Sequence, residues 1–355
     1  MRKSALIKTS VMVAALGLLL IGCYQMLAFL QMRTATALGW EGDRYLWMAG
    51  GGVGAARWDV DRQTITERSF FWPSGINHLL ARKEGGIEGY GDDGVWLFEA
   101  GKWIQMDEAS GLQRGRIEDM IQARDGTLWV ATYSGFKTWD EKTRMWEPTP
   151  INQPGVTLVQ GLDDSLWFGL AEDGVIRLQS GKLTHWTTGD GLIDNRIESI
   201  LPASDGTIWV GTLRGVSHWD GNKWQGWPSL GYPDPDGLRV FRLLEAKDGT
   251  IWADTSEDFA RWKNGEWTTY QQSPSCFGAF SFLETDDGGL WAGCSTGLFR
   301  WTGSSWREYG KSEGVTDNGW SHVIQGANGI LYAKTKSGIY RYVPEQDRWQ
   351  SFPNK

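Results

Sequence analysis

The amino-acid sequence predicts an all-β fold, an eight-bladed β-propeller preceded by one N-terminal membrane helix, with a seven-bladed ring as the alternative. Three observations support this fold class. A unit of about 41 residues recurs along the chain, each copy contains short apolar segments separated by Asp-Gly or Gly-Asn turns, and the first 33 residues differ in composition from all that follow. We therefore expect a membrane segment at 1–33 and a propeller of eight four-stranded repeats at 34–355.

The N-terminal segment has the pattern of a membrane anchor. Arg2, Lys3 and Lys8 precede residues 11–32, which carry no charge. About 20 apolar residues are enough to cross a bilayer. Because the positive charges precede the span, we expect the rest of the chain to lie outside the cytoplasm.

A lipoprotein signal is the alternative interpretation of the same segment. The residues Leu20-Ile21-Gly22-Cys23 resemble a lipoprotein box, in which Cys23 would be acylated and become the new N-terminus. The residues after Cys23 remain apolar, whereas a lipoprotein normally continues into a polar tether, so we favour the uncleaved anchor. Both interpretations predict the same extracytoplasmic location.

Charge and cysteine content limit the possible functions. The formal net charge is −8 and no run is rich in Lys or Arg, so we do not expect nucleic acid as a partner. Only Cys276 and Cys294 lie in the repeat region, which is too few for a disulfide framework. They are a candidate disulfide, since Cys294 replaces the Thr that ends a second strand and Cys276 lies in the loop above it. We expect no cofactor.

The second strand of each repeat is the clearest element. It follows an Asp-Gly turn at 125–132, 205–212, 248–255 and 287–294. One position in this strand is nearly always Trp, and its eight equivalents are Trp47, Glu88, Trp129, Trp167, Trp209, Trp252, Trp291 and Tyr332. A large flat side chain fills the space where neighbouring blades pack face to face. We therefore interpret most of the 23 tryptophans as core rather than as a sugar-stacking surface.

The other three strands follow from the same alignment of repeats. A Gly-apolar-x-x-aromatic segment after each second strand predicts a third strand, and a fourth begins after a short Gly or Asn turn. The first strand precedes the Asp-Gly turn and is rich in β-branched or large apolar residues, as at 197–201. The repeats need no helix after residue 33.

The repeats resemble the two-component regulator propeller repeat. The segments that carry the resemblance are Gly191-Leu-Ile-Asp-Asn-Arg-Ile-Glu-Ser-Ile200 and Asp205-Gly-Thr-Ile-Trp-Val-Gly-Thr-Leu-Arg-Gly-Val216. In weaker form the resemblance covers 35–352. It implies an extracytoplasmic propeller that senses a ligand, often a carbohydrate, on behalf of a signalling protein. Because no kinase segment follows the repeats, we expect a separate partner such as a sensor kinase or a transporter.

One position in the first strand is polar and varied. It lies seven residues before the turn Gly, and its eight equivalents are Ala37, His78, Asp119, Thr157, Ser199, Arg242, Ser281 and His322. A structural role would keep one residue type, as the Trp position nearly does. Equivalent offsets must lie at one height around the axis, so we expect these side chains at the mouth of the central channel. A water-filled channel lined by unselected polar residues is the alternative.

We expect the ligand-binding residues to line one funnel at this mouth. Four candidates, His78, Asp119, Arg242 and His322, stand at this position, and Glu118 and Glu198 stand one residue before it. Arg116, Arg196 and Arg239 lie at the start of the same strands, and Trp320 lies at the start of blade eight. Arg116, Arg196 and Arg239 would form a cationic rim. Because guanidinium groups offer a fixed fork of donors, such a rim suits an anionic or hydroxyl-rich small molecule, such as a carbohydrate.

The sequence favours a binding protein over an enzyme, since no two histidines have metal-ligand spacing and no residue is predicted to be catalytic. A propeller lyase similar to virginiamycin B lyase is one alternative. It would need a metal, together with His78 or His322 and with Glu118 or Glu198. A scaffold that holds a membrane protein complex through its blade rims is the other alternative.

Overall fold

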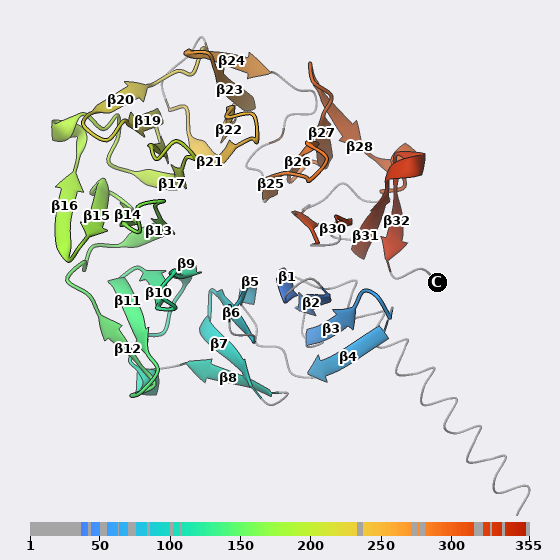
Figure 1. The fold of residues 1–355 in the computed structure, drawn as a ribbon, viewed down its shortest axis with the longest axis horizontal. Helices are drawn as coiled ribbons and strands as arrows, with labels where there is room; N and C mark the ends of the chain where they lie inside the picture. Colours follow the sequence, from blue (N-terminus) through green and yellow to red (C-terminus); the bar gives the residue numbers. More distant parts are fainter. Residues whose placement is uncertain are drawn as a thin grey trace, which may run out of the picture.

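The propeller is described here from a computed structural model of the chain. The structure describes residues 37–41, 44–49, 55–62, 64–69, 76–83, 86–99, 102–106, 108–232, 237–270, 276, 281–315, 322–326, 329–335 and 338–352. These residues form eight four-stranded antiparallel sheets, arranged as the blades of a ring around a central channel (Figure 1). The predicted all-β, eight-bladed propeller is confirmed.

Strands follow chain order within each sheet, and the first strand of each blade is innermost (Figure 1). The strands of blades one to four are β1 (Ala37–Glu41), β2 (Tyr45–Ala49), β3 (Ala55–Asp59), β4 (Thr64–Ser69), β5 (Ile76–Ala81), β6 (Ile87–Gly91), β7 (Gly94–Glu99), β8 (Lys102–Met106), β9 (Ile117–Gln122), β10 (Leu128–Thr132), β11 (Gly135–Asp140), β12 (Met145–Pro148), β13 (Gly155–Gln160), β14 (Leu166–Leu170), β15 (Val175–Gln179) and β16 (Lys182–Trp186).

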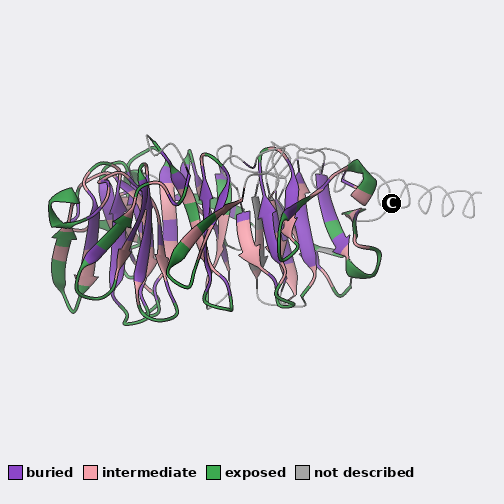
Figure 2. Ribbon diagram, turned by 90° about the horizontal axis from the view of Figure 1, so that it is seen from above, coloured by how far each residue is buried: buried purple, intermediate pink, exposed green. Residues whose placement is uncertain are grey.

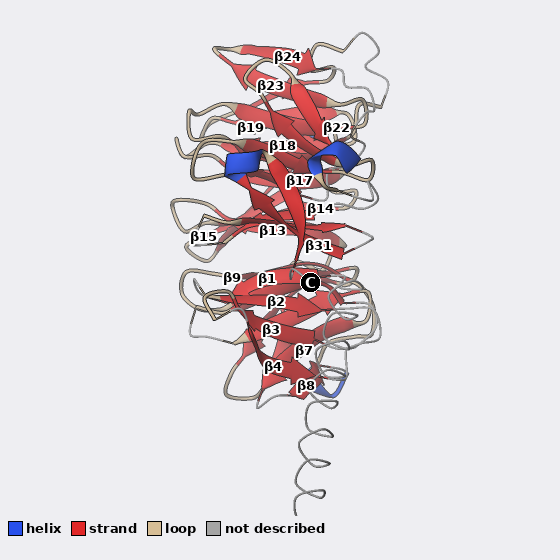
Figure 3. Cartoon of the chain, turned by 90° about the vertical axis from the view of Figure 1, so that its right-hand side faces the viewer, coloured by secondary structure: helices blue, strands red, loops and turns tan. Residues whose placement is uncertain are grey.

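Blades five to eight repeat the same order. Their strands are β17 (Ile197–Pro202), β18 (Ile208–Thr212), β19 (Gly215–Trp219), β20 (Trp224–Trp227), β21 (Val240–Glu245), β22 (Ile251–Thr255), β23 (Phe259–Lys263), β24 (Glu266–Tyr270), β25 (Ser281–Glu284), β26 (Leu290–Gly293), β27 (Leu298–Trp301), β28 (Trp306–Tyr309), β29 (His322–Gln325), β30 (Leu331–Thr335), β31 (Gly338–Val343) and β32 (Arg348–Phe352). The helical segments of the described chain are single 3₁₀ turns, η1 (Glu108–Ser110), η2 (Thr188–Asp190), η3 (Lys311–Glu313) and η4 (Pro344–Gln346) (Figure 3).

The core is divided into one apolar cluster for each junction between blades. Seen from the side, the buried residues lie along the strands while the turns on both faces are exposed (Figure 2). The repeated Trp lies inside these clusters; Trp209, for example, is 4% exposed and packs on Trp227 with ring centroids 5.6 Å apart. Aromatic rings therefore form much of the packing between blades, as the repeat pattern predicts.

Blade two has a charged residue at the position that is Trp in most other blades. Glu88 stands at the Trp position and is completely buried. Its carboxylate pairs with Arg82 across 2.5 Å. Burying a carboxylate without a partner would be strongly unfavourable, so the substitution for Trp requires this nearby cation.

The ring closes without a shared strand. Among the residues that the structure describes, blade one consists of β1–β4 and blade eight of β29–β32. Closure between them comes instead from an apolar cluster that includes Leu46, Trp58, Tyr332 and Ile339. The Trp58 ring also meets Phe352 edge-on, with centroids 5.3 Å apart. The first and last blades are therefore joined by side-chain packing.

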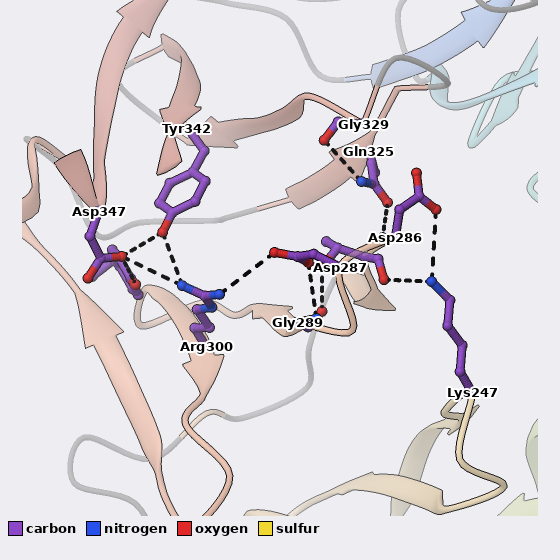
Figure 4. A network of polar contacts seen from close by, with 11 residues as sticks. Lys247, Asp286, Asp287, Gly289, Arg300, Gln325, Gly329, Tyr342 and Asp347 are labelled. Carbon is purple, nitrogen blue, oxygen red and sulfur yellow. Dashed lines mark hydrogen bonds and ion pairs between the residues drawn. The ribbon is translucent and has the colours of Figure 1, made fainter. Parts of the chain in front are cut away.

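A recurring hydrogen bond joins neighbouring blades on the face that carries the turns between first and second strands. In five blades the first strand ends in a Gln or Glu whose side-chain oxygen accepts a hydrogen bond from a backbone N–H of the preceding blade. The donor is the second residue after the end of that blade's own first strand. We call this the inter-blade latch. The pairs, at 2.5–3.0 Å, are Lys83–Gln122, Arg124–Gln160, Ser204–Glu245, Lys247–Glu284 and Asp286–Gln325. Figure 4 includes the latch between Asp286 and Gln325.

The predicted membrane segment at 1–33, with Cys23, lies outside the described residues. Within the described part of the chain, no helix is long and apolar enough to cross a membrane.

Candidate ligand-binding site

A cavity of about 1090 Å³ opens at the channel mouth, on the face where first strands begin and second strands turn into third strands. Eight of the ten predicted site residues line it, and they come from four blades: His78, Arg116, Glu118, Asp119, Arg196, Glu198, Arg239 and Arg242. His322 lies at the equivalent place in blade eight but is not among the lining residues, and Trp320 lies outside the described residues. The structure thus brings together residues that are far apart in sequence.

A β-bulge explains why two successive residues of one strand reach the same cavity. Side chains of a regular strand alternate between faces, so Glu118 and Asp119 should point in opposite directions. In β9 the pairing with β10 shifts between Ile117 and Asp119, which leaves Glu118 as an extra residue. Blades two, four, five and six have the same shift at the same place. A bulge redirects side chains in this way and is frequent beside binding sites.

We call the position of His78, Asp119, Arg242 and His322 and their equivalents the ring position. Arg242 of blade six is the electrostatic centre of this ring. Burial has the largest effect on the pKa of His78 in blade two, Asp119 in blade three and His322 in blade eight, and the positive charge of Arg242 acts to lower each pKa, although that of Asp119 is raised overall. One guanidinium therefore acts on residues from three other blades.

The two histidines of the ring are held neutral. Burial lowers the pKa of His322 to about 4, and the charges of Arg242, His78 and Lys334 add to this effect. Burial also lowers the pKa of His78, whose ring stacks on Tyr90 with centroids 5.1 Å apart. Nδ1 of His322 is buried and has no hydrogen-bond partner within the described chain. At neutral pH both imidazoles can therefore accept as well as donate hydrogen bonds.

Two ring residues also join neighbouring blades. Asp119 Oδ2 accepts hydrogen bonds from Thr157 Oγ1 at 2.9 Å and from the backbone N–H of Leu158 at 3.0 Å, both in blade four. Ser281 Oγ accepts in the same way from the N–H of Val323 in blade eight, at 2.6 Å. Burial raises the pKa of Asp119, although these hydrogen bonds act against it. The expectation that ring residues have no structural role is therefore wrong for Asp119 and Ser281.

The arginines at the rim carry a balanced charge. Arg116 pairs with Glu118 at 3.1 Å, Arg196 with Asp194 at 2.8 Å and Arg239 with Glu198 at 2.8 Å. Each guanidinium of the cationic rim expected from the sequence thus has a carboxylate beside it. A ligand that contacts Arg116 or Arg239 can therefore also contact the carboxylate of Glu118 or Glu198. A hydroxyl group can accept from the guanidinium and donate to the carboxylate, so the rim suits hydroxyl groups as well as anions.

Three second-strand residues beside the ring position were missed by sequence reasoning, and of these Tyr90 lines the cavity. Tyr90, Asp254 and Lys334 lie on second strands, directly opposite His78, Arg242 and His322 in the strand pairing. The equivalents in blades three, four, five and seven are Ala131, Gly169, Gly211 and Gly293. A large or charged residue at a position that is Gly or Ala in other blades is a sequence signal for this site. It could have been recognised by aligning the second strands with the first strands that they pair with.

Among the described residues, no group of three or more His, Cys, Asp or Glu side chains is arranged to hold a metal ion.

The candidate disulfide lies near the channel-mouth face of blade seven. Cys276 and Cys294 are bonded in the structure, with Cα atoms 5.4 Å apart, and both are fully buried. Labelling of both thiols in unreduced protein would contradict the bond.

Comparison with known proteins agrees with this fold. The family model of the two component regulator propeller matches residues 191–214. No curated protein matches the chain by sequence. A similar solved structure is the extracellular domain of a putative hybrid two component system from B. thetaiotaomicron, with a TM-score of 0.60 and 22% identity over 75% of this chain. The match spans only 37% of that domain.

Two other solved structures share the fold. The computationally designed Ika8 protein has a TM-score of 0.63 at 15% identity, covering 87% of this chain and 95% of the designed one. Virginiamycin B lyase from Staphylococcus aureus has a TM-score of 0.51 at 13% identity, covering 87% and 94%. At these identities the likeness concerns the fold. The family match lies in the segment with the strongest repeat motif, and the chain thus carries the two-component regulator propeller repeat.

Proposed function

We propose that the chain is a sensing or binding protein that takes a small anionic or hydroxyl-rich molecule at the channel mouth. The observation that supports this proposal is the convergence of His78, Asp119 and Arg242, from three different blades, on one cavity of about 1090 Å³. Ligand sites are typically concave and contain a few converging polar groups. The ring offers a guanidinium fork, neutral imidazoles and carboxylates to one ligand.

We further propose that the propeller works outside the cytoplasm with a separately encoded sensor kinase or transporter. Two observations support this location and partner. One similar structure is described as the extracellular domain of a two component system. The charged N-terminus before the apolar stretch at 11–32 favours the same side of the membrane.

The proposal is tested by calorimetric titration with oligogalacturonate, which carries both carboxylate and hydroxyl groups, and with a neutral oligosaccharide of the same length. Arg242→Lys removes the planar fork but retains a positive charge opposite the buried Asp254. We expect this variant to bind oligogalacturonate at least about tenfold more weakly. Arg144→Lys, on an exposed turn of blade three, is the matched control and should leave binding unchanged.

A propeller lyase is the second candidate function. The shared fold of virginiamycin B lyase and the presence of His78 and Glu118 in one cavity favour it. Incubation with a streptogramin B antibiotic in the presence of Mg²⁺, followed by mass spectrometry, tests it. Ring opening that is lost in His78→Ala and His322→Ala would replace the binding proposal with this one.

A further inference from the structure

The junction between blades four and five lacks the inter-blade latch. The first strand of blade five, β17, ends at Pro202, where the latch position of blades three, four, six, seven and eight holds Gln or Glu. The residue that would donate from blade four is Leu162. Its counterparts Lys83, Arg124 and Lys247 also reach with their side chains to a turn carbonyl of the next blade, at 2.8–3.1 Å. Both halves of the contact are therefore apolar residues at this junction. Blade two also has an apolar residue, Ala81, at the latch position.

A Gln latch makes two hydrogen bonds with opposite polarity. In blade four the Gln160 oxygen accepts from the N–H of Arg124 at 2.8 Å, and its nitrogen donates to the carbonyl of Asp164 at 3.4 Å. Gln325 does the same with Asp286 N–H and Gly329 O, at 3.0 Å each. At the Pro202 junction the corresponding groups are Leu162 N–H and Gly206 O. Neither has a hydrogen-bond partner within the described residues.

A cavity of about 170 Å³ occupies the place of the missing latch. It is lined by Leu162, Arg177, Pro202, Gly206 and Trp219, among others. The Nε atom of Arg177 is buried there without a hydrogen-bond partner in the described chain. The cavity thus presents two donors and one acceptor without hydrogen-bond partners in the described chain. Leu162 and Gly206 are exposed, whereas the Nε atom is buried, and a buried polar atom is rarely left unpaired.

We propose that this cavity is a docking socket for the primary amide of a glutamine side chain on a partner protein. The molecule itself indicates which groups fit, because the equivalent place holds a carboxamide at three other junctions and a carboxylate at two. The choice between them depends on Gly206 O, which needs a donor. A carboxylate fits less well, since it has no hydrogen to donate to Gly206 O. It would also approach Asp163, whose own pKa is kept low by hydrogen bonds from Ser165 and Arg177, although burial opposes them.

We expect the glutamine to belong to a protein, because a cavity of this size cannot by itself bind a small molecule tightly. A side-chain amide has few heavy atoms, and the binding energy available per atom is limited. Leu162, at the edge of the socket, is 56% exposed, and Leu183 of the same blade is 39% exposed. These side chains offer apolar contact to residues that flank the glutamine. The socket lies on the face opposite the channel mouth, so it is independent of the ligand proposed there.

The test uses the full-length chain labelled with ¹⁵N-leucine and follows the Leu162 amide signal. Acetyl-glutamine-methylamide should shift this signal with saturation below about 50 mM, whereas acetyl-glutamate-methylamide should not. A blocked Leu-Gln-Leu peptide should bind at least about tenfold more tightly than the single blocked residue. No shift with the glutamine probe, or equal shifts with both probes, would overturn the socket. Equal affinity for the single residue and the peptide would overturn the protein partner.

Pro202→Gln supplies the amide from within the chain. We expect this variant to shift the Leu162 signal in the absence of any probe and to abolish the response to the glutamine probe. Pro202→Ala, which removes the proline ring without adding an amide, should retain the response. A full response in Pro202→Gln would contradict the proposal. The titration of the wild-type chain decides the question by itself if Pro202→Gln does not fold.

Discussion

Two positions on the same inner strand behave in opposite ways. The ring position faces the channel mouth, and the latch position lies three residues further on, at the other end of the strand. At the latch position, five described first strands end in Gln or Glu and make the same bond to the preceding blade. The ring position instead varies from Ser and Thr to Asp, Arg and His. The latch thus repeats one chemistry in five blades, although the first strands of blades two and five end at Ala81 and Pro202, whereas the ring position uses several chemistries.

Two residues at the ring position also join neighbouring blades. Asp119 and Ser281 each accept a hydrogen bond from a backbone N–H of the next blade. A varied position can therefore contain individual residues with a structural role. Substitutions in the core, the ring and the latch separate these contributions.

The largest effect is expected for Trp209→Ala. This side chain is 4% exposed and packs between blades five and six against Trp227, Trp262 and Trp267. Its truncation leaves a large cavity and should lower the free energy of unfolding by about 3–5 kcal/mol. Urea denaturation monitored by circular dichroism measures the loss. A change below about 1 kcal/mol would show that the aromatic clusters do not determine blade packing.

His322 should make stability depend on pH. Its pKa is lowered to about 4 in the folded chain, against about 6.5 when unfolded. Between these values the unfolded chain binds more protons, so stability should fall as the pH falls from about 6.5 to about 4. The expected loss is on the order of 2 kcal/mol.

Urea midpoints of wild type and His322→Gln at pH 7 and pH 4.5 measure this effect. Because His78 and His218 also have lowered pKa values, the difference between the two proteins is the relevant quantity. Equal losses in both proteins would contradict the assignment to His322.

A smaller effect is expected for Gln160→Leu at the latch position. Leucine cannot accept from the N–H of Arg124, so the variant should lose about 1 kcal/mol. Gln179→Leu, on the outer part of the same blade, is a control that removes a carboxamide without touching a latch. If both variants lose the same stability, the latch contributes nothing of its own.

The fold was predictable because the repeat fixes it at many positions at once. The Trp equivalents from Trp47 to Tyr332 all lie on second strands, and Glu88 is no exception. The latch was not recognised because its partners are side chain and backbone of different blades, about 40 residues apart. A backbone donor leaves no residue pattern in the sequence.

The site was predictable in part for the same reason. Equal offsets in different repeats lie at equal heights, which brought His78, Glu118, Asp119, Glu198 and Arg242 into one cavity. Three features could not be predicted from the position of a residue within its repeat, because they depend on which strands and side chains pair in the folded chain. They are the bulges, the second-strand residues such as Tyr90, and the ion pairs that neutralise the rim. Asp254 lies buried opposite Arg242, so Arg242→Lys, which keeps a positive charge there, is a cleaner test of the site than Arg242→Ala.

The most direct measurement places Arg242→Lys beside Gln160→Leu, with the unfolding free energy and the affinity for oligogalacturonate determined for each. The account predicts that Arg242→Lys changes stability by less than about 0.5 kcal/mol while its affinity falls at least about tenfold. Gln160→Leu should lose about 1 kcal/mol and keep its affinity. The reverse pattern, with affinity intact in Arg242→Lys and stability lost, would contradict the claim that the ring position is a ligand-binding surface.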